Sequence, residues 1–93
     1  MNRVLLRSSA FVRTARRFIK KNLQSSAEIR SALELLGADP FHPRLKSHKL
    51  KGDLEGSWAC SAGYDLRLVF KFVEYKGAEA ILLESIGTHD EVY

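Results

Sequence analysis

Leu66-Arg67-Leu68-Val69-Phe70-Lys71-Phe72-Val73 is the stretch that decides the fold. Its largest apolar side chains recur at every second position, and a basic residue stands at two of the positions between them. Because successive side chains of a strand point to opposite faces, this period of two predicts a strand with one face in the core. The same register turns Arg67 and Lys71 to the other face of the sheet.

Further strand patterns lie on both sides of this stretch. Trp58, Cys60 and Ala62 alternate with smaller residues before it, and an apolar run at residues 80–86 follows a turn centred on Gly77. A short apolar run within residues 2–7 predicts one more strand at the start of the chain. The sequence therefore predicts four strands, three of them consecutive.

Two helices are predicted between the first strand and the other three. Phe11, Ala15 and Phe18 recur at helical spacing after Ser8 or Ser9, either of which can cap the helix. The second helix is expected to begin at the capping box Ser25-Ser26-Ala27-Glu28 and to end in a left-handed turn at Gly37. The order β-α-α-β-β-β predicts one α+β domain over residues 1–93, with a helical hairpin on one face of a mainly antiparallel four-stranded sheet.

Composition sets the class of protein. With 93 residues, of which 45% are hydrophobic and 28% charged, the chain can build one core. The single cysteine, Cys60, cannot form an internal disulfide and is expected to be buried in its strand. No apolar run approaches the ~18 residues of a membrane span, so we expect a cytoplasmic protein that does not enter a membrane.

Charge is divided unevenly along the chain. Residues 1–51 carry twelve Lys and Arg against three acids, and residues 52–93 carry three against eight, although the net charge is only +4. The basic half is the one to expect on a polyanion. Its densest part surrounds His48, where Arg44, Lys46, Lys49 and Lys51 form either a solvated basic face or contacts to the phosphates of a polyanion.

The end of the chain carries unusual chemistry. In Ile86-Gly87-Thr88-His89-Asp90-Glu91-Val92-Tyr93, a histidine, two carboxylates and a phenol follow directly on the last predicted strand. That strand is the expected hairpin partner of the one with Arg67, so His89 and Arg67 are candidates for a single site. His48 is a candidate for the same face. Two imidazoles beside a guanidinium, which can bind a phosphate through two hydrogen bonds, favour acid–base chemistry on an anionic substrate.

Other chemistries find little support in the sequence. His42 and His48 lie six residues apart among prolines and basic residues, and this arrangement disfavours a divalent cation. The chain has no glycine-rich phosphate loop before a helix, no nucleophile elbow and no cysteine beside a base. We therefore expect metal-free chemistry without a cofactor.

Four stretches together resemble a known family. They are Leu45-Lys46-Ser47-His48-Lys49-Leu50-Lys51-Gly52, Gly56-Ser57-Trp58, Gly63-Tyr64-Asp65-Leu66-Arg67-Leu68-Val69-Phe70 and Ile86-Gly87-Thr88-His89-Asp90-Glu91-Val92-Tyr93. The chain resembles toxins of the bacterial RelE/ParE superfamily over its whole length, most closely the RelE/StbE and YafQ-like mRNA interferases. The resemblance implies a microbial ribonuclease-like fold, in agreement with the predicted order of elements.

The resemblance also implies an activity, a partner and a set of residues. The activity is cleavage of mRNA in the ribosomal A site, and the partner is a cognate antitoxin that holds the toxin inactive. Matching positions imply a catalytic histidine at His89, a terminal aromatic at Tyr93, a strand arginine at Arg67, a histidine of the basic segment at His48 and an acidic residue at Asp65. A histidine that precedes this acid in YafQ-like proteins has no counterpart here, so the division of acid and base roles stays open.

Two other functions are compatible with the sequence. A ParE-like toxin would inhibit DNA gyrase without cutting nucleic acid, although such toxins tend to lack the histidine-centred terminal motif. A non-catalytic RNA-binding or ribosome-binding module would use only the basic half of the chain. Exposed basic surface beside a groove between helices and sheet would suit an acidic amphipathic segment of an antitoxin.

Overall fold

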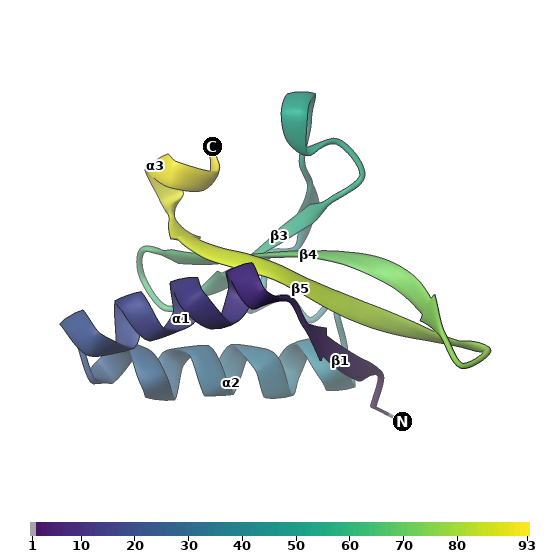
Figure 1. The fold of residues 1–93 in the computed structure, drawn as a ribbon, viewed down its shortest axis with the longest axis horizontal. Helices are drawn as coiled ribbons and strands as arrows, with labels where there is room; N and C mark the ends of the chain where they lie inside the picture. Colours follow the sequence, from purple (N-terminus) through teal and green to yellow (C-terminus); the bar gives the residue numbers. More distant parts are fainter. Residues whose placement is uncertain (1) are drawn as a thin grey trace.

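The computed structural model describes residues 2–93. The chain forms a mixed sheet with two long helices on one face and a short terminal helix on the other (Figure 1). Its elements are β1 (Val4–Arg7), α1 (Ser9–Lys21), α2 (Gln24–Ala38), β2 (His48–Lys49), the 3-10 turn η1 (Gly52–Leu54), β3 (Trp58–Ala62), β4 (Leu66–Tyr75), β5 (Ala78–Thr88) and α3 (His89–Val92).

The strands lie in the order β1-β5-β4-β3-β2. β1 runs parallel to β5, and the remaining neighbours are antiparallel. This arrangement confirms the predicted α+β fold, with its helical hairpin and its mainly antiparallel sheet. Two elements are additions to the prediction, namely the fifth strand β2 and the helix α3. Both are too short, at two and four residues, for hydrophobic periodicity to reveal them.

The two long helices begin differently from each other. Ser8 caps α1 as predicted, because its hydroxyl accepts a hydrogen bond of 3.0 Å from the Phe11 amide. The predicted capping box of α2 is wrong: the helix already begins at Gln24, and Ser25 is buried inside its first turn. Asn22 satisfies the start of this helix instead, since its side-chain oxygen accepts from the Gln24 amide at 3.0 Å.

The predicted left-handed turn at Gly37 is also wrong. Gly37 is buried within α2, which continues to Ala38. The carbonyl of Gly37 accepts a hydrogen bond of 2.9 Å from the Arg3 amide, and a Cβ at this position would lie 3.7 Å from the Arg3 carbonyl oxygen. Gly37 is therefore an interior residue of α2 at its contact with the segment that leads into β1, and a Cβ there would make only ordinary van der Waals contact.

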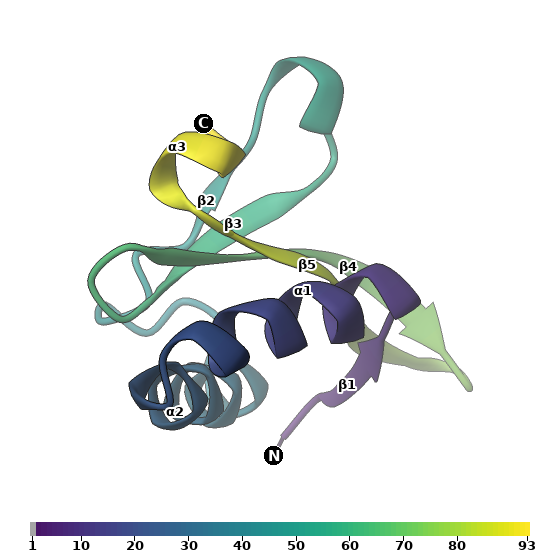
Figure 2. The ribbon, with the colours of Figure 1, turned by 60° about the vertical axis from the view of Figure 1, so that its left-hand side comes forward.

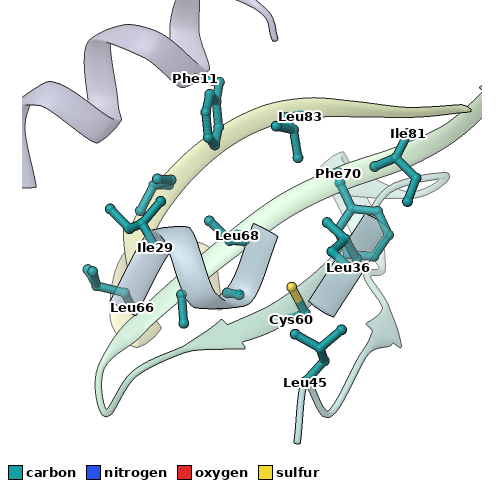
Figure 3. Packing of buried hydrophobic residues seen from close by; sticks show 13 residues of the cluster. Phe11, Ile29, Leu36, Leu45, Cys60, Leu66, Leu68, Phe70, Ile81 and Leu83 are labelled. Atoms are coloured by element: carbon teal, nitrogen blue, oxygen red, sulfur yellow. The ribbon is translucent and has the colours of Figure 1, made fainter. Parts of the chain in front are cut away.

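The core lies between the helices and the sheet (Figure 3). From β4 it takes Leu66, Leu68 and Phe70, as the alternation predicts, and the helices contribute Phe11 and Leu36 among others. Cys60 is fully buried here, and burial raises the pKa of its thiol to about 12, against a small opposing effect of Arg67. The cysteine is therefore a packing residue and not a nucleophile.

A β-bulge in β5 determines which face of the sheet each of its later side chains occupies. Val69 pairs with Ser85 and Phe70 with Leu83, so Glu84 between them has no partner on β4. Leu83 and Ile86 consequently both reach the core, although they are three residues apart. Beyond the bulge, Gly87 pairs with Arg67, and this pairing prepares the site described below.

The opposite face of the sheet carries a smaller apolar cluster, the outer cluster. Leu50, Ala59 and Val69 are buried there, and Val92 of α3 packs against them. Among the helices of residues 2–93, none is long and apolar enough to cross a membrane.

Candidate active site

Strand register brings Arg67 to the face of the sheet that the long helices leave uncovered. Ser61, Arg67 and Gly87 lie side by side on β3, β4 and β5. Gly87 contributes no side chain, and α3 folds over it so closely that a Cβ there would lie 3.2 Å from Val92 and 3.3 Å from the Glu91 Cβ. Glycine at this position lets α3 turn back over the sheet after β5 (Figure 2).

A capping box begins this helix. The Thr88 amide donates to the Glu91 carboxylate at 2.9 Å, and the Glu91 amide donates to the Thr88 hydroxyl at 3.3 Å. Arg17 of α1 adds an ion pair with Glu91 at 3.2 Å. The hydrogen bond from the Thr88 backbone is the main cause that lowers the pKa of Glu91, and Arg17 acts in the same direction. Glu91 is therefore ionised and holds α3 in place.

Asp65 fixes the other side of α3. The His89 amide donates to the Asp65 carbonyl at 3.0 Å and, at a longer 3.4 Å, to the Asp65 carboxylate. The Asp65 side chain is exposed and does not line the pocket beside Arg67. Its contacts are those of a residue that positions His89.

His48 reaches the same face from the edge of the sheet. It pairs with Ala59 on β3, whose side chain belongs to the cluster opposite the helices. Its Nδ1 lies 3.0 Å from the Lys46 carbonyl oxygen. Since a carbonyl can only accept, this hydrogen bond requires a proton on Nδ1, and Nε2 of the neutral imidazole is then free to accept a proton.

Tyr93 lies between the two imidazoles. Its ring centroid is 4.7 Å from that of His89 and 5.2 Å from that of His48, and it is nearly parallel to the latter. Burial raises the pKa of Tyr93, and the neighbouring Arg67 guanidinium opposes this rise. The phenol is consequently neutral at physiological pH and can donate a hydrogen bond.

These residues enclose one open pocket of about 320 Å³. It is lined by Lys46, His48, Ser61, Arg67, His89 and Tyr93. The structure thus brings together five residues singled out in the sequence, and it adds Ser61. Arg67 donates to the Leu66 carbonyl at 2.9 Å, and no carboxylate forms an ion pair with it within residues 2–93. Its positive charge therefore remains available to an anion.

The other basic candidates lie outside this pocket. Lys49 alternates with His48 on β2 and lies on the other face, with its ammonium 5.7 Å from the centroid of the Trp58 ring. Lys51 is exposed between β2 and η1. Arg44 lines an adjacent groove together with Lys46. Of the four predicted phosphate contacts, only Lys46 adjoins both histidines.

Sequence reasoning missed three features of the site. In the sequence Ser61 is only an alternating strand position, because its pairing with Arg67 depends on the register of β3 and β4. The Thr88-to-Glu91 capping box carries the ordinary Thr-x-x-Glu signal and could have been read from the sequence. The Arg17 contact depends on tertiary packing and gives no such signal.

Within residues 2–93, no three His, Cys, Asp or Glu side chains come close enough together to hold a metal ion.

Comparison with known proteins assigns the chain to a class and then to a family. The model of a family described as the bacterial toxin of type II toxin-antitoxin system, YafQ, matches residues 3–93. The chain is therefore a toxin of a type II toxin-antitoxin system. It belongs to the YafQ family, which confirms the resemblance seen in its sequence. No curated protein matches the sequence significantly.

Solved structures share the fold at low sequence identity. YafQ from E. coli strain BL21(DE3) is 18% identical with a TM-score of 0.76, and the match covers 98% of each chain. A YoeB/ParE toxin from Agrobacterium tumefaciens is 16% identical with a TM-score of 0.75 over 92% of this chain and 98% of its own. The E. coli DinJ-YafQ toxin-antitoxin complex contains a chain that is 18% identical, with a TM-score of 0.73 over 100% of this chain and 99% of that one.

Proposed function

We propose that this toxin is a metal-independent endoribonuclease that cleaves mRNA, in the ribosomal A site, and that its active site is the pocket between His48, Arg67, His89 and Tyr93. The observation that carries the proposal is the convergence of two imidazoles, a guanidinium and a neutral phenol on one open pocket. The family supplies the context, since its members are toxins.

The reaction needs two proton transfers and one anion site. A base removes the proton from a ribose 2′-OH, the 2′-oxygen forms a bond to phosphorus, and the bond from phosphorus to the 5′-oxygen breaks. An acid gives the departing 5′-oxygen its proton. The products are a 2′,3′-cyclic phosphate and a 5′-hydroxyl, and no water, metal or cofactor enters the cleavage step.

The contacts of the two histidines support a division of roles. The Lys46 carbonyl fixes the proton of neutral His48 on Nδ1, and this leaves Nε2 to act as the base. His89 is the remaining imidazole of the pocket, and its Nδ1 lies 3.5 Å from the Asp90 carboxylate. We therefore assign the acid role to His89.

Arg67 and Lys46 supply positive charge at the phosphate. As the 2′-oxygen adds to phosphorus, negative charge accumulates on the non-bridging oxygens. The guanidinium of Arg67 can stabilise this charge through two parallel hydrogen bonds. Lys46 lines the same pocket and would compensate the charge of the ground-state phosphate. Tyr93 would keep both imidazoles oriented and donate its neutral hydroxyl toward the phosphate.

A cognate antitoxin is the expected protein partner. The E. coli relative of this chain is found in a complex with DinJ. The basic helix α1 and the apolar groove where β1 and the two long helices meet would suit an acidic segment with an apolar stripe. Co-expression with the neighbouring reading frame should relieve growth arrest and give a complex that co-purifies.

Inducible expression with mapping of RNA 5′ ends tests the activity. Wild type should arrest growth and produce new ends within translated messages, whereas His89→Ala and Arg67→Ala should each reduce them by at least roughly a hundredfold. His42→Asn is the matched control. His42 lies outside the pocket, and asparagine can still accept from the Arg44 amide as His42 does at 3.1 Å.

Three outcomes would speak against the proposal. Full cleavage by both His89→Ala and Arg67→Ala would separate the pocket from the activity. Growth arrest without new RNA ends, accompanied by loss of gyrase supercoiling, would indicate a ParE-like toxin. Ribosome binding without new ends would indicate a non-catalytic module.

A further inference from the structure

A second hollow adjoins the pocket just described. It is a groove of about 650 Å³ between the first turns of α2, the loop before β2 and the turn that joins β3 to β4. The groove and the active-site pocket share Lys46, Ser61 and Arg67, so the two are continuous. A strand of RNA whose phosphate lies at Arg67 must leave the pocket on one side, and this groove offers a path.

Cations mark the junction between the two hollows. Lys46 and Arg67 line both of them, and Arg44 lines the groove beyond. The loop that carries Lys46 is held firmly, because the Ser61 amide donates to the Leu45 carbonyl at 2.7 Å and Leu45 is buried. These side chains suit a phosphate next to the scissile one.

Tyr64 extends from the β3–β4 turn at the rim of this groove. Its side chain is 97% exposed, and it makes no aromatic contact within residues 2–93. The ring thus contributes almost nothing to the core. Its backbone is tied to the site, since Arg67 donates to the Tyr64 carbonyl at 3.4 Å. Proteins that bind single-stranded RNA commonly stack a base on an exposed aromatic ring beside a phosphate site.

Glu28 is the acidic residue of the groove. Its carboxylate lies against Gly63, where φ is +83° and any Cβ would overlap with it. Within residues 2–93 it forms neither an ion pair nor a hydrogen bond. A carboxylate repels phosphate but accepts from paired N–H donors, and guanine presents two such donors on its Watson–Crick edge.

We propose that this groove is a second nucleotide subsite, in which a base next to the scissile phosphate stacks on Tyr64 and presents its donor edge to Glu28. Guanine is the base that this chemistry favours. The inference rests on the proposed ribonuclease function and extends it to the selection of the cleavage site.

The test sequences the RNA 5′ ends produced in translated messages by wild type and variants. Tyr64→Ala should lower cleavage roughly tenfold at all positions, and Tyr64→Phe should recover most of the loss because it keeps the ring. Glu28→Gln should lower the share of guanine at the position that flanks the cut by roughly fivefold or more, since one acceptor becomes a donor.

Matched controls separate stacking and base selection from general damage. Tyr75→Ala removes an exposed tyrosine from the β4–β5 turn, at the opposite end of the sheet (Figure 1), and should cleave like wild type. Glu34→Gln changes a carboxylate of α2 that does not line the groove. Far-ultraviolet circular dichroism checks that each variant is folded.

The outcomes distinguish this inference from the function on which it rests. If wild type cleaves and Tyr64→Ala cuts as well as Tyr75→Ala, with the base profile of Glu28→Gln unchanged, the subsite is refuted while the ribonuclease assignment stands. Loss of antitoxin co-purification by Tyr64→Ala, with cleavage intact, would assign the surface to a protein partner and overturn the subsite. Absence of new ends with wild type would refute both.

Discussion

At the scale of single residues, Tyr93 is the side chain that contacts both histidines. Both His48 and His89 contact its ring, although His48 lies in β2 and His89 begins α3. Burial raises its pKa, so the hydroxyl is neutral over the physiological range. The ring and the hydroxyl therefore have separable effects.

Substitutions of Tyr93 should separate them. Tyr93→Ala removes two aromatic contacts, each worth about 0.5–1.5 kcal/mol, and should lower kcat/KM roughly tenfold to a hundredfold. Tyr93→Phe should lower kcat/KM less than Tyr93→Ala does. The pH dependence of its cleavage rate should match that of wild type up to about pH 9, because the wild-type phenol is not ionised there. The measurement is the cleavage rate on ribosomes that carry a defined message. Equal losses with Phe and Ala would instead show that the ring contacts with the two histidines contribute nothing to cleavage.

The sequence alone predicts that Arg67 lies on the face of the sheet away from the helices. The prediction rests on the alternation of apolar side chains in β4. Its position next to Ser61 and Gly87 could not be predicted, because it depends on the register between three strands and on a bulge at Glu84. A bulge changes which face a residue occupies without leaving a distinct pattern in the sequence.

At the scale of elements, α3 is the part on which the site depends most. It is one turn long and exposed, and it is held by a capping box, by Arg17 and by the packing of Val92 on the outer cluster. Isolated helices of this length do not form in water, so these contacts must supply its stability. Damage to them should disable the site before it affects the rest of the fold.

Gly87→Ala tests the close packing under α3. The added Cβ would approach Val92 at 3.2 Å and Glu91 at 3.3 Å, so α3 must shift. We expect cleavage to fall roughly tenfold or more, because a displacement of about 1 Å at a catalytic group has effects of that order. Global stability, measured by denaturant unfolding, should change by less than about 1.5 kcal/mol. A large global loss would show that Gly87 serves the core instead.

Acidification tests the contribution of Glu91. Because the pKa of Glu91 is lowered on folding, its contribution is present above the ordinary value of 4.5 and is lost as the pH falls through the folded value. The His89 amide resonance should therefore differ between wild type and Glu91→Ala at pH 7 and converge as the pH falls below the folded pKa of Glu91. Glu74→Ala is the control, since Glu74 is an exposed carboxylate near the far end of β4 and takes no part in the cap. Identical spectra of wild type and Glu91→Ala at pH 7 would contradict this account.

At the scale of the whole molecule, the sheet lies between the main core and the candidate site. The main core fills the face under α1 and α2, and the candidate site occupies the opposite face (Figure 1). Strand alternation predicts this division, and so the fold class and the main core residues of β4 could be predicted. β2 and α3 could not, because two-residue and four-residue elements are defined by tertiary contacts such as those of His48 with Ala59 and of His89 with Asp65.

Removal of residues 89–93 tests this separation. All strand pairings are retained, because β5 ends at Thr88, and only Val92 leaves the outer cluster. We expect the truncated chain to fold with a loss of about 1–2 kcal/mol and to have no cleavage activity. Circular dichroism with denaturant unfolding measures the first effect and 5′-end mapping the second. A truncated chain that remained unfolded, or one that still cleaved mRNA, would contradict the division.

The chemistry of the product ends tests the central claim most directly. Purified toxin is incubated with ribosomes that carry a defined message, and both new termini are then identified by mass spectrometry. Attack by the 2′-oxygen, with His48, Arg67 and His89 in the roles proposed, predicts a 2′,3′-cyclic phosphate and a 5′-hydroxyl, and His48→Ala should lose both together. A 5′-phosphate beside a free 3′-hydroxyl, or unbroken mRNA with wild-type toxin, would contradict the account.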